Sequence, residues 1–551
     1  MSVSMSVSMS VSVRVCVCVC VRVRVRVCVF VYTYDTHTTH IHTHIHTHTY
    51  THTHTHTQTR TQTLSLSHTH THTHPHTHSL SLTLSHTHTH THTHTHTQVV
   101  VVGAGVAGMA CALELKERGI PCTVVEAAPE PGGRVRTDQV DGFLLDHGFQ
   151  IFLTSYPEAQ RLLDYKQLEL QPFYAGAQVR FGGAFHKLAD PLRAPLDALL
   201  SLSPAHPIGS VYDKILIGVL RVQSLLPTID ELYARVDVSI GARLGNDVFF
   251  GTAFSAEMVD RFFRPFLGGI FFDNKLRTNA HELDFVFRML ALGENCLPKK
   301  GIRAVPDYMA ALLPAGTLRL NTPVASIAQD GTSVTLASGE VLKAAAVVVA
   351  TDGSAARKLL GAIGADLEAE GDIKKTMCLY FAIDGDAPSP EPILYLNGDG
   401  VEDAEGTTKV NNMCFPSTIS PSYAPPGKSL ASVSLIGIPP QTDAQVAADV
   451  KTQLAAWFGP SVQDWRLLKT YRIPYCQPNQ EVPSSREKSV EVQPFVYVTG
   501  DHRDTGSLQG ALRSGTRCGQ AVSAALSPLL LARSRDLVAE FAQSKGISLE
   551  I

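Results

Sequence analysis

A glycine-rich turn between two short apolar runs constrains the fold of this chain more than any other feature. Residues 99–102 are four consecutive valines, as expected of a strand that is buried on both faces of a parallel sheet. Gly103, Gly105 and Gly108 follow at once, and residues 109–118 then place apolar side chains at helical spacing. This order predicts the strand, turn and helix of a dinucleotide-binding α/β unit.

The three glycines have separate tasks in such a unit. Gly103 permits the tight turn, Gly105 lets the backbone approach a pyrophosphate, and Gly108 lets the helix pack closely against the strand. The helix begins at Val106 and Ala107, where backbone amides and a partial positive charge favour phosphate. A glycine turn that serves packing alone is the other interpretation of this segment.

An acidic residue completes the dinucleotide pattern. Residues 122–125 form a second strand-like run, and Glu126 ends it 18 residues after Gly108. A carboxylate at this point accepts hydrogen bonds from ribose hydroxyls and repels a 2′-phosphate, which disfavours NADP. The segment therefore predicts an adenine dinucleotide, but by itself it does not choose between NAD and FAD.

The residues after Glu126 favour FAD. Gly132, Gly133 and Arg134 stand in the spacing E-x(5)-G-G-R-x-x-T, which resembles the flavin-containing amine oxidase and carotenoid desaturase superfamily. In that family the glycine pair forms a turn over the cofactor diphosphate. The resemblance implies that Arg134 contacts the phosphates, for which its planar guanidinium fork is suited. A surface salt bridge is the alternative role for this arginine.

A second motif of the same superfamily lies near the C-terminus. Residues 494–499 read as a strand that ends in Gly500 and Asp501, and the string around Leu508 and Gly510 resembles the closing flavin motif. The resemblance implies that Asp501 accepts a hydrogen bond from a ribityl hydroxyl or meets the diphosphate. It also implies that backbone amides near Leu508 face the flavin pyrimidine edge, at a helix N-terminus that stabilises negative charge.

A third, shorter resemblance lies between these two motifs. Residues 297–302 are similar to the proline–glycine entry segment of the family, and residues 321–324 precede an alternating strand pair. The resemblance implies that backbone groups of Val324 hold the adenine. It covers about residues 98–530 and implies FAD as the cofactor.

The cofactor motifs are far apart in the chain, which predicts a discontinuous domain in an α/β fold. We expect a Rossmann-like FAD-binding domain from residues 98–165, 295–360 and 485–535, and an inserted α+β substrate domain from residues 166–294 and 361–484. Residues 536–551 are expected to form a C-terminal tail. Active sites favour such domain junctions.

The two inserts are apolar. Apolar residues between 215 and 226 fall largely on one helical face, and residues 262–272 are unusually aromatic. We interpret the aromatic run either as plain core or as the wall of an apolar substrate pocket. Strand-like runs in the second insert, which predict a mixed sheet, are residues 377–384, 392–396 and 428–438.

Two departures from the amine oxidase pattern bear on the chemistry. Ser507 stands where amine oxidases carry one of the two aromatic residues that flank the flavin, and a serine there is closer to the plant-type carotenoid desaturases. Gln477 follows Cys476 where covalent flavin attachment would call for an aromatic residue, so we expect non-covalent FAD. The cysteines show no Cys-x-x-Cys spacing, and no metal site is expected.

His147 is the best candidate for a catalytic polar group near the flavin ring. It lies in residues 142–149, which resemble the family's D-x-G segment leading to the flavin, and imidazole serves as acid or base near neutral pH. A histidine fixed by structural hydrogen bonds is the alternative. His502 and Arg503 follow Asp501 and either bind an anionic group or lie exposed to solvent.

Composition separates the first 98 residues from the rest. They hold 21 of the 26 histidines and one of the 50 acidic residues, in alternating pairs such as His-Thr and Val-Cys. Alternation places the histidines on one face of a strand, where they could bind metal. The same pairs arise from translated dinucleotide repeats, and we expect residues 1–97 to be disordered. No signal peptide pattern is readable, so the compartment stays unassigned; the desaturase resemblance would favour a plastid.

The remaining 453 residues carry 41 basic and 49 acidic side chains and no run of 18 apolar residues, which excludes a dedicated nucleic-acid binder and a membrane span.

We expect an FAD-dependent oxidoreductase that transfers hydride from a hydrophobic small molecule to flavin N5 and then reduces oxygen or a quinone. A desaturase or isomerase ranks first, a protoporphyrinogen oxidase-like enzyme second and an amine oxidase third. A GTPase-escort-like binding protein of the same fold is the non-enzymatic alternative. The apolar insert also suits contact with a membrane surface.

Overall fold

The computed structural model describes residues 12–20, 24–32, 46–49, 98–246, 248, 251–364, 367 and 373–544. Within the N-terminal segment, the alternating sequence forms an antiparallel sheet of β1 (Ser12–Cys20), β2 (Arg24–Tyr32) and β3 (His46–Thr49). The rest of the segment for which we expected disorder, residues 1–97, lies outside the described residues. The chain from residue 98 onward makes up most of a second unit.

A six-stranded sheet carries the glycine-rich turn. Its neighbouring strands are parallel except at one edge, where β23 runs antiparallel to β24. Every residue of β4 and β17 is buried, as the valine-rich strands of a parallel sheet covered on both faces must be. The strands in spatial order are β13 (Leu318–Arg319), β5 (Cys122–Val125), β4 (Val99–Val102), β17 (Ala346–Val349), β24 (Val496–Val498) and β23 (Glu491–Gln493).

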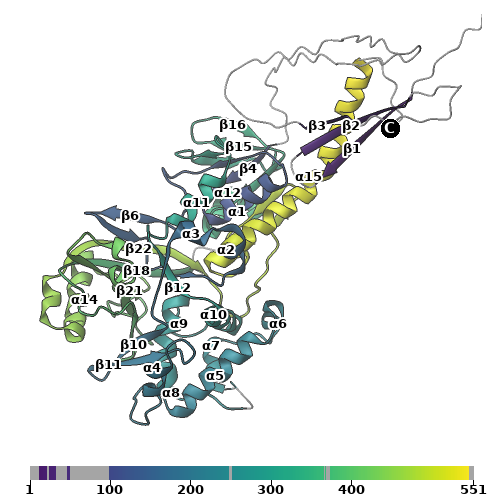
Figure 1. The fold of residues 1–551 in the computed structure, drawn as a ribbon. Coiled ribbons are helices and arrows are strands. Elements are labelled where there is room, and N and C mark those ends of the chain that lie inside the picture. The colour runs from purple at the N-terminus through teal and green to yellow at the C-terminus, as the bar shows by residue number, and fades with distance from the viewer. Residues whose placement is uncertain are drawn as a thin grey trace, which may run out of the picture. The chain divides into compact units, whose positions relative to one another are not determined.

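Helices cover both faces of this sheet (Figure 1). Val99 and Val101 of β4 belong to the same core as α1 (Val106–Glu117) and α15 (Leu508–Ser544), and Val100 and Val102 belong to the core of α12 (Gly353–Leu360). The helices α1 and α15 touch through their backbones, because a Cβ at Gly519 would lie 3.0 Å from the carbonyl oxygen of Cys111. α15 also continues through most of the stretch that we expected to be a tail.

Short elements complete the part of the chain around this sheet. Three small sheets are present, and three short helices lie near them. The sheets are β14 (Val324–Ile327) with β15 (Ser333–Leu336) and β16 (Val341–Lys343), β6 (Thr137–Val140) with β7 (Phe143–Asp146), and β8 (Phe152–Leu153) with β12 (Asn295–Pro298) and β9 (Leu170–Pro172). The helices are α2 (Pro157–Leu162), α3 (Tyr165–Leu168) and α11 (Ala304–Leu312).

A seven-stranded sheet forms the centre of the inserted α+β part. It is mixed, as expected, because β10 runs parallel to β19 while the other neighbours are antiparallel. One face packs against α14 (Asp443–Phe458), which begins with a capping box at Thr442; a short helix, α13 (Pro416–Ile419), follows β20. The strands in spatial order are β11 (Ala184–Ala189), β10 (Gly176–Phe181), β19 (Leu394–Asn397), β20 (Asn412–Cys414), β21 (Lys428–Ile436), β18 (Ile373–Asp384) and β22 (Arg466–Pro478).

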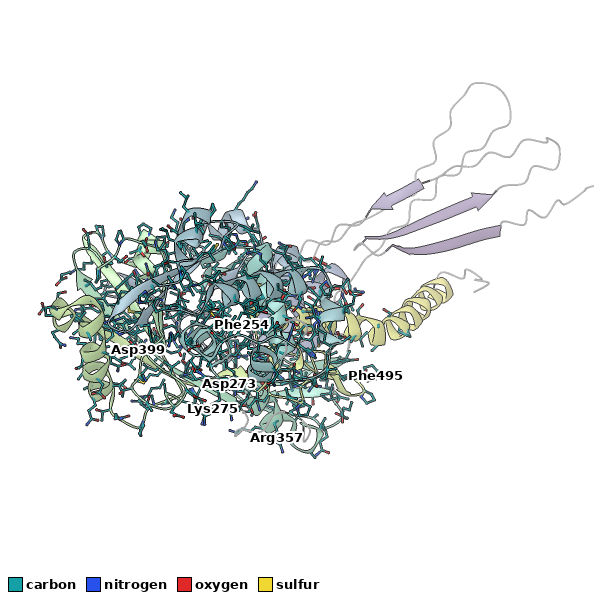
Figure 2. All side chains as sticks on the ribbon, turned by 90° about the horizontal axis from the view of Figure 1, so that it is seen from below. Phe254, Asp273, Lys275, Arg357, Asp399 and Phe495 are labelled. Carbon is teal, nitrogen blue, oxygen red and sulfur yellow. The ribbon has the colours of Figure 1, made fainter. Side chains whose placement is uncertain are left out.

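After β11 the first insert is helical, and its aromatic run packs in and against the core. Phe254, labelled in Figure 2, packs edge-on against Phe263 at 4.7 Å between ring centroids, and Phe262 stacks on Phe266 at 5.3 Å. These contacts support the core interpretation of residues 262–272. The helices are α4 (Pro195–Ser201), α5 (Val211–Leu225), α6 (Ile229–Tyr233), α7 (Ile240–Asn246), α8 (Ala256–Met258), α9 (Arg264–Phe271) and α10 (Ala280–Leu292), with a π-helical turn over Val259–Phe263.

The prediction of a single apolar face between residues 215 and 226 is wrong in part. α5 lies against α10 and buries Leu216 and Leu220, but Ile215, Val222 and Leu226 are exposed. One row of residues four apart fills the contact with α10, so apolar side chains outside that row face solvent. Among the described residues, no helix has both the length and the apolar composition that crossing a bilayer requires.

Candidate functional site

Four parallel strands end side by side at one edge of the six-stranded sheet. The register pairs Val102 with Val125 on one side and with Val349 on the other, and pairs Val349 with Val498. The next residues along the chain are therefore neighbours in space. In open α/β sheets ligands bind at this carboxyl edge.

The glycine turn at this edge has the conformation that its sequence predicts. Gly103 has a φ of +108°, in the region that favours glycine, and a Cβ there would lie 2.8 Å from the carbonyl oxygen of Ala350. A Cβ at Gly108 would collide with the carbonyl oxygen of Gly103. A Cβ at Gly105, by contrast, meets no atom within 4 Å. The backbone at Gly105 is thus open to a ligand, and α1 begins directly after it at Val106 and Ala107.

The Gly132–Gly133 turn sits directly on the first glycine turn. The amide of Gly132 donates to the carbonyl oxygen of Ala104 at 2.8 Å, and Gly132 forms a parallel bridge with Gly105. A Cβ at Gly133 would be 3.6 Å from the Cα of Gly105. Two sequence motifs that surround a phosphate in the resembled family therefore meet in one place.

Glu126 lies beside this turn, and the Val324 segment lies beside Glu126. The Glu126 carboxylate accepts hydrogen bonds from the amides of Ala104 at 2.8 Å and Ala128 at 2.9 Å. Each carboxylate oxygen retains a further lone pair that a ribose hydroxyl can use. The amide of Thr322 donates to the Glu126 carbonyl oxygen at 2.7 Å, so β14 begins at Val324 close to the carboxylate.

Arg134 and Asp501, 367 residues apart, bind each other. Two hydrogen bonds of 2.7 and 2.6 Å join the guanidinium to the carboxylate, whose side chain is 5% exposed. Arg134 also donates to the carbonyl oxygen of Cys476 and lies over the Tyr475 ring. Burial alone lowers the pKa of Arg134, but the charge and hydrogen bonds of Asp501 outweigh burial and raise it. Arg134 is therefore a permanent cation beside the glycine turns.

The helix after the closing motif begins as the sequence predicts. α15 starts at Leu508, and the amide of Gly510 donates to the Ser507 hydroxyl at 3.0 Å, which makes Ser507 the cap. A Cβ at Gly510 would collide with the backbone of Thr505. The amide of Gly500 donates to the hydroxyl of Ser514 on α15, so the end of β24 is tied to this helix.

His147 lies in a hydrogen-bonded cluster, as its structural interpretation requires. Its ring is 3.4 Å from the Asp138 carboxylate, bonds Arg136 at 3.0 Å and lies 4.4 Å from the Tyr471 ring. Burial and the charge of Arg136 lower the pKa of His147, so it is neutral at pH 7. Gln150 donates to the carbonyl oxygens of both His147 and Arg134, which places the cluster next to the cofactor segments.

Two buried carboxyl groups lie outside the residues singled out from the sequence. Asp146 accepts hydrogen bonds from Thr137, Tyr423 and the amide of Ile302, and burial raises its pKa to about 6. Asp146 thereby joins the β6–β7 hairpin to the proline–glycine segment of residues 297–302. The D-x-G motif that begins at Asp146 is the sequence pattern that could have identified this residue. Glu282, in α10, belongs to no motif and is buried, with 6% of its surface exposed.

The expectation that His502 binds an anion or lies exposed is wrong. Its side chain is 2% exposed, and burial lowers its pKa to about 3, so the ring is neutral. The ring packs behind Gly500, away from solvent, because the short 3-10 turn at Asp501–Arg503 directs it inward. Among the described residues, no group of three or more His, Cys, Asp or Glu side chains could hold a metal ion.

This arrangement fits FAD, because an open backbone, a helix N-terminus, the Glu126 carboxylate with free lone pairs and a permanent cation meet at one edge of the sheet. The fold and the site are those of an FAD-dependent oxidoreductase. A family model for flavin containing amine oxidoreductases matches residues 106–523. The chain belongs to this family.

Curated relatives and solved structures agree with this assignment. Protoporphyrinogen oxidase 2, chloroplastic/mitochondrial, of Arabidopsis thaliana is 32% identical over 168 residues, which are 30% of this chain and 31% of that protein. Coproporphyrinogen III oxidase of Propionibacterium freudenreichii subsp. freudenreichii is 29% identical over 175 residues, 30% of each chain. The chain thus spans about a third of the length of the curated relatives that it matches.

Two solved structures share the fold. An oxidoreductase from Methanosarcina mazei has a TM-score of 0.57 at 18% identity and covers 76% of this chain and 99% of its own. A putrescine oxidase double mutant has a TM-score of 0.56 at 16% identity and covers 78% and 99%.

Proposed function

We propose that this chain oxidises an apolar small molecule by moving two electrons and a hydrogen from a substrate C–H to FAD. The observation that carries the proposal is the convergence of three distant segments, at Gly105, Gly132 and Asp501, on one edge of the sheet. FAD, when bound, supplies the electron acceptor, and the protein holds it and excludes water. Oxygen or a quinone then takes the electrons.

Among substrate classes, we propose a porphyrinogen first and a polyene second. The curated relatives are named as oxidases of porphyrinogens, which supports moving this class ahead of the desaturase-like one. A simple amine comes last, because Ser507 occupies the position of a flanking aromatic residue. Serine has no ring that could form an aromatic wall beside an amine. The Ser507 hydroxyl is instead engaged with Gly510 and with Thr505.

Stopped-flow measurement of flavin reduction tests the reaction and the substrate together. The FAD-loaded protein is mixed without oxygen with a porphyrinogen, a carotenoid precursor or an amine, and bleaching of the flavin is followed. We expect porphyrinogen to bleach it fastest. Bleaching by amines alone would overturn the substrate class, and absence of a flavin spectrum after reconstitution with FAD would overturn the enzyme itself.

We also propose that one surface of the helical insert contacts a membrane. Of the large apolar side chains that are exposed in the described body, most fall between residues 192 and 236, with Leu196 79% and Leu200 74% exposed. An apolar patch of this kind marks an interaction site. Residues 192–236 carry four basic and four acidic side chains, whereas the body as a whole has a net charge of −8, so this surface repels an anionic lipid face less than the rest of the body does. The exposed residues are Leu192, Leu196, Leu199, Leu200, Leu202, Val211, Tyr212, Ile215, Val222, Leu226 and Val236.

Flotation with liposomes tests this contact. The double variant Leu196→Ser/Leu200→Ser should lose binding to vesicles that contain anionic lipid, while Val341→Ser, at an exposed apolar residue of β16, should keep it. Equal flotation of both variants, or none by the unaltered protein, would refute the proposal.

For the compartment, we propose a plastid or a mitochondrion. The Arabidopsis relative is named as chloroplastic/mitochondrial, which supports both. Fractionation of the source cells, with detection of the endogenous protein by an antibody against residues 98–544, tests this; recovery in the cytosolic fraction alone would refute it.

A further inference from the structure

The loop that follows Asp501 closes over a small polar cavity. The cavity measures about 10 Å³, the space that one water molecule needs. It lies against the flavin-binding loop, because Gln480 accepts a hydrogen bond from the amide of Gly506 at 2.8 Å and also lines the cavity. The lining residues are Glu282, Pro478, Asn479, Gln480, Ser484, Ser485, Lys488, His502 and Asp504.

His502 needs a partner that this cavity can provide. Both ring nitrogens are buried, and neither makes a hydrogen bond to any described group. The nearest carboxylate oxygen, on Asp501, is 4.0 Å from Nδ1. A neutral imidazole has one donor and one acceptor, and a single water molecule can satisfy both kinds of atom. Buried polar groups without partners are rare, so the ring favours a water in this cavity.

Glu282 and Asp504 share the cavity but carry different charges. The Glu282 carboxyl is contacted by the Tyr233 hydroxyl at 3.3 Å from each oxygen. Asp504 is paired with Arg513 and, at 3.1 Å, with Arg517. Burial and the neighbouring Asp504 charge raise the pKa of Glu282 to about 8. Burial raises the pKa of Asp504 as well, against the charge of Arg513. Asp504 has two arginine partners that stabilise its carboxylate, so Glu282 is the carboxyl that keeps its proton at neutral pH.

Charged and titratable groups surround each of the three side chains Glu282, Asp504 and His502. Glu282 is faced by Asp504, Tyr233, Arg486 and Tyr156. Asp504 is faced by Arg513, Arg517 and Arg486, and His502 is faced by Asp501, Arg503, Arg134 and Lys488.

We propose that Glu282, Asp504 and His502 form a buried proton-binding site around one water molecule, and that this site takes up a proton when the bound flavin is reduced. Two electrons from the reductant and one proton go to the flavin, which leaves one added negative charge next to the loop. Near and above pH 8, where part of Glu282 is ionised before reduction, a second proton taken from solvent past Ser485 binds at Glu282 and compensates that charge. Reoxidation returns both protons to the acceptor or to solvent.

In this scheme Glu282 touches neither flavin nor substrate. It responds to the charge of the flavin through the loop of residues 501–507. The inference rests on FAD binding and on redox cycling, which belong to the proposed function, but it does not depend on which substrate is used. Negative charge nearby strengthens proton binding by a carboxyl group. A tenfold strengthening corresponds to an extra uptake of about half a proton per flavin at the midpoint pH.

Proton uptake during photoreduction of the FAD-loaded protein tests this site. The flavin is reduced by light with a sacrificial donor in weak buffer, and an indicator dye reports protons taken up per flavin from pH 6 to pH 9. The unaltered protein should take up more than Glu282→Gln near pH 8 and the same amount at pH 6, where Glu282 already holds its proton. Glu340→Gln, an exposed glutamate paired with Arg319, is the matched control and should behave like the unaltered protein.

A second variant keeps the test decisive if Glu282→Gln fails to hold FAD. Tyr233→Phe removes the hydrogen bond that favours the Glu282 carboxylate, so the pH of greatest extra uptake should rise. Equal uptake by the unaltered protein and Glu282→Gln at pH 8, or an unmoved maximum in Tyr233→Phe, would overturn the inference alone. Failure of every variant and of the unaltered protein to bind FAD would instead overturn the proposed function.

Discussion

The substitution Gly105→Ala separates cofactor binding from folding more sharply than any other change in the site. In the structure a Cβ at Gly105 meets no atom within 4 Å, and its φ is not in the region reserved for glycine. The variant should therefore fold at least as well as the unaltered protein. A gain of about 0.4–1 kcal/mol is typical where alanine fits the backbone of a glycine.

FAD binding should respond in the opposite direction. The added methyl group occupies the space through which the backbone approaches the diphosphate, and it displaces charge-assisted hydrogen bonds worth about 1.5–3 kcal/mol each. Loss of one such bond raises the Kd for FAD by about ten- to a hundredfold. Gly108→Ala is the comparison, because its Cβ collides with the carbonyl oxygen of Gly103 and lies 3.0 Å from the Cβ of Ala350. Overpacking of this kind costs about 1–3 kcal/mol of stability.

The two variants are measured in two assays. Apoprotein is unfolded with urea to give the free energy of unfolding, and FAD is titrated while its fluorescence is followed. Gly105→Ala should lose affinity alone, and Gly108→Ala should lose both affinity and stability. The reasoning is refuted if Gly105→Ala binds FAD as tightly as the unaltered protein, or if it is destabilised as much as Gly108→Ala.

Three further predictions concern the charged groups. Asp501→Asn leaves Arg134 without its carboxylate partner, and the free energy of unfolding of the apoprotein should fall by about 1–2 kcal/mol. The loss is smaller than for a fully buried pair because the Arg134 side chain is 38% exposed. Urea unfolding that shows no loss would contradict the pairing. His147→Gln should slow flavin reduction by less than about tenfold, because the imidazole ring is held by Arg136 and Asp138 in a structural role. A fall in the rate of about a hundredfold or more in stopped-flow experiments would instead show that His147 is a catalytic acid or base. Glu282 has a folded pKa of about 8, above its ordinary 4.5, so it favours folding at low pH and loses that contribution as pH rises toward 8. His502, whose pKa falls from 6.5 to about 3, has the opposite effect, but only below pH 6.5. Between pH 6.5 and 8 the unaltered protein should therefore lose up to about 1.4 kcal/mol of stability per pH unit relative to Glu282→Gln in urea unfolding, and parallel pH profiles would speak against a buried proton on Glu282.

The local parts of the site could be predicted from the sequence because short-range chemistry determines them. The valine run before Gly103 can only be a buried strand, and the glycine spacing has few uses other than a tight turn before a helix. The start of α15 near Leu508 was implied only by the family resemblance, and the structure adds that Ser507 caps it. Each of these features depends on fewer than ten consecutive residues.

Contacts between distant residues could not be predicted in this way. Resemblance assigned Arg134 and Asp501 separate cofactor atoms, and only the fold shows that they bind each other in this structure. Glu282 joins the cluster with His502 because α10 packs near the closing loop, and no pattern within α10 indicates it. Periodicity likewise finds the apolar residues of α5 but not which row faces α10, so the exposure of Ile215 was missed.

The direct backbone contact between α1 and α15 has a consequence for cofactor choice. In the proposed function α1 begins at the diphosphate of FAD and α15 at the flavin ring, and Gly515 and Gly519 of α15 let the two helices approach closely because they carry no side chains. The distance between the N-terminus of α1 and the N-terminus of α15 is therefore fixed by this packing. If FAD binds as proposed, FMN lacks the part that reaches the start of α1, and we expect the protein to select its cofactor by length as well as by chemistry.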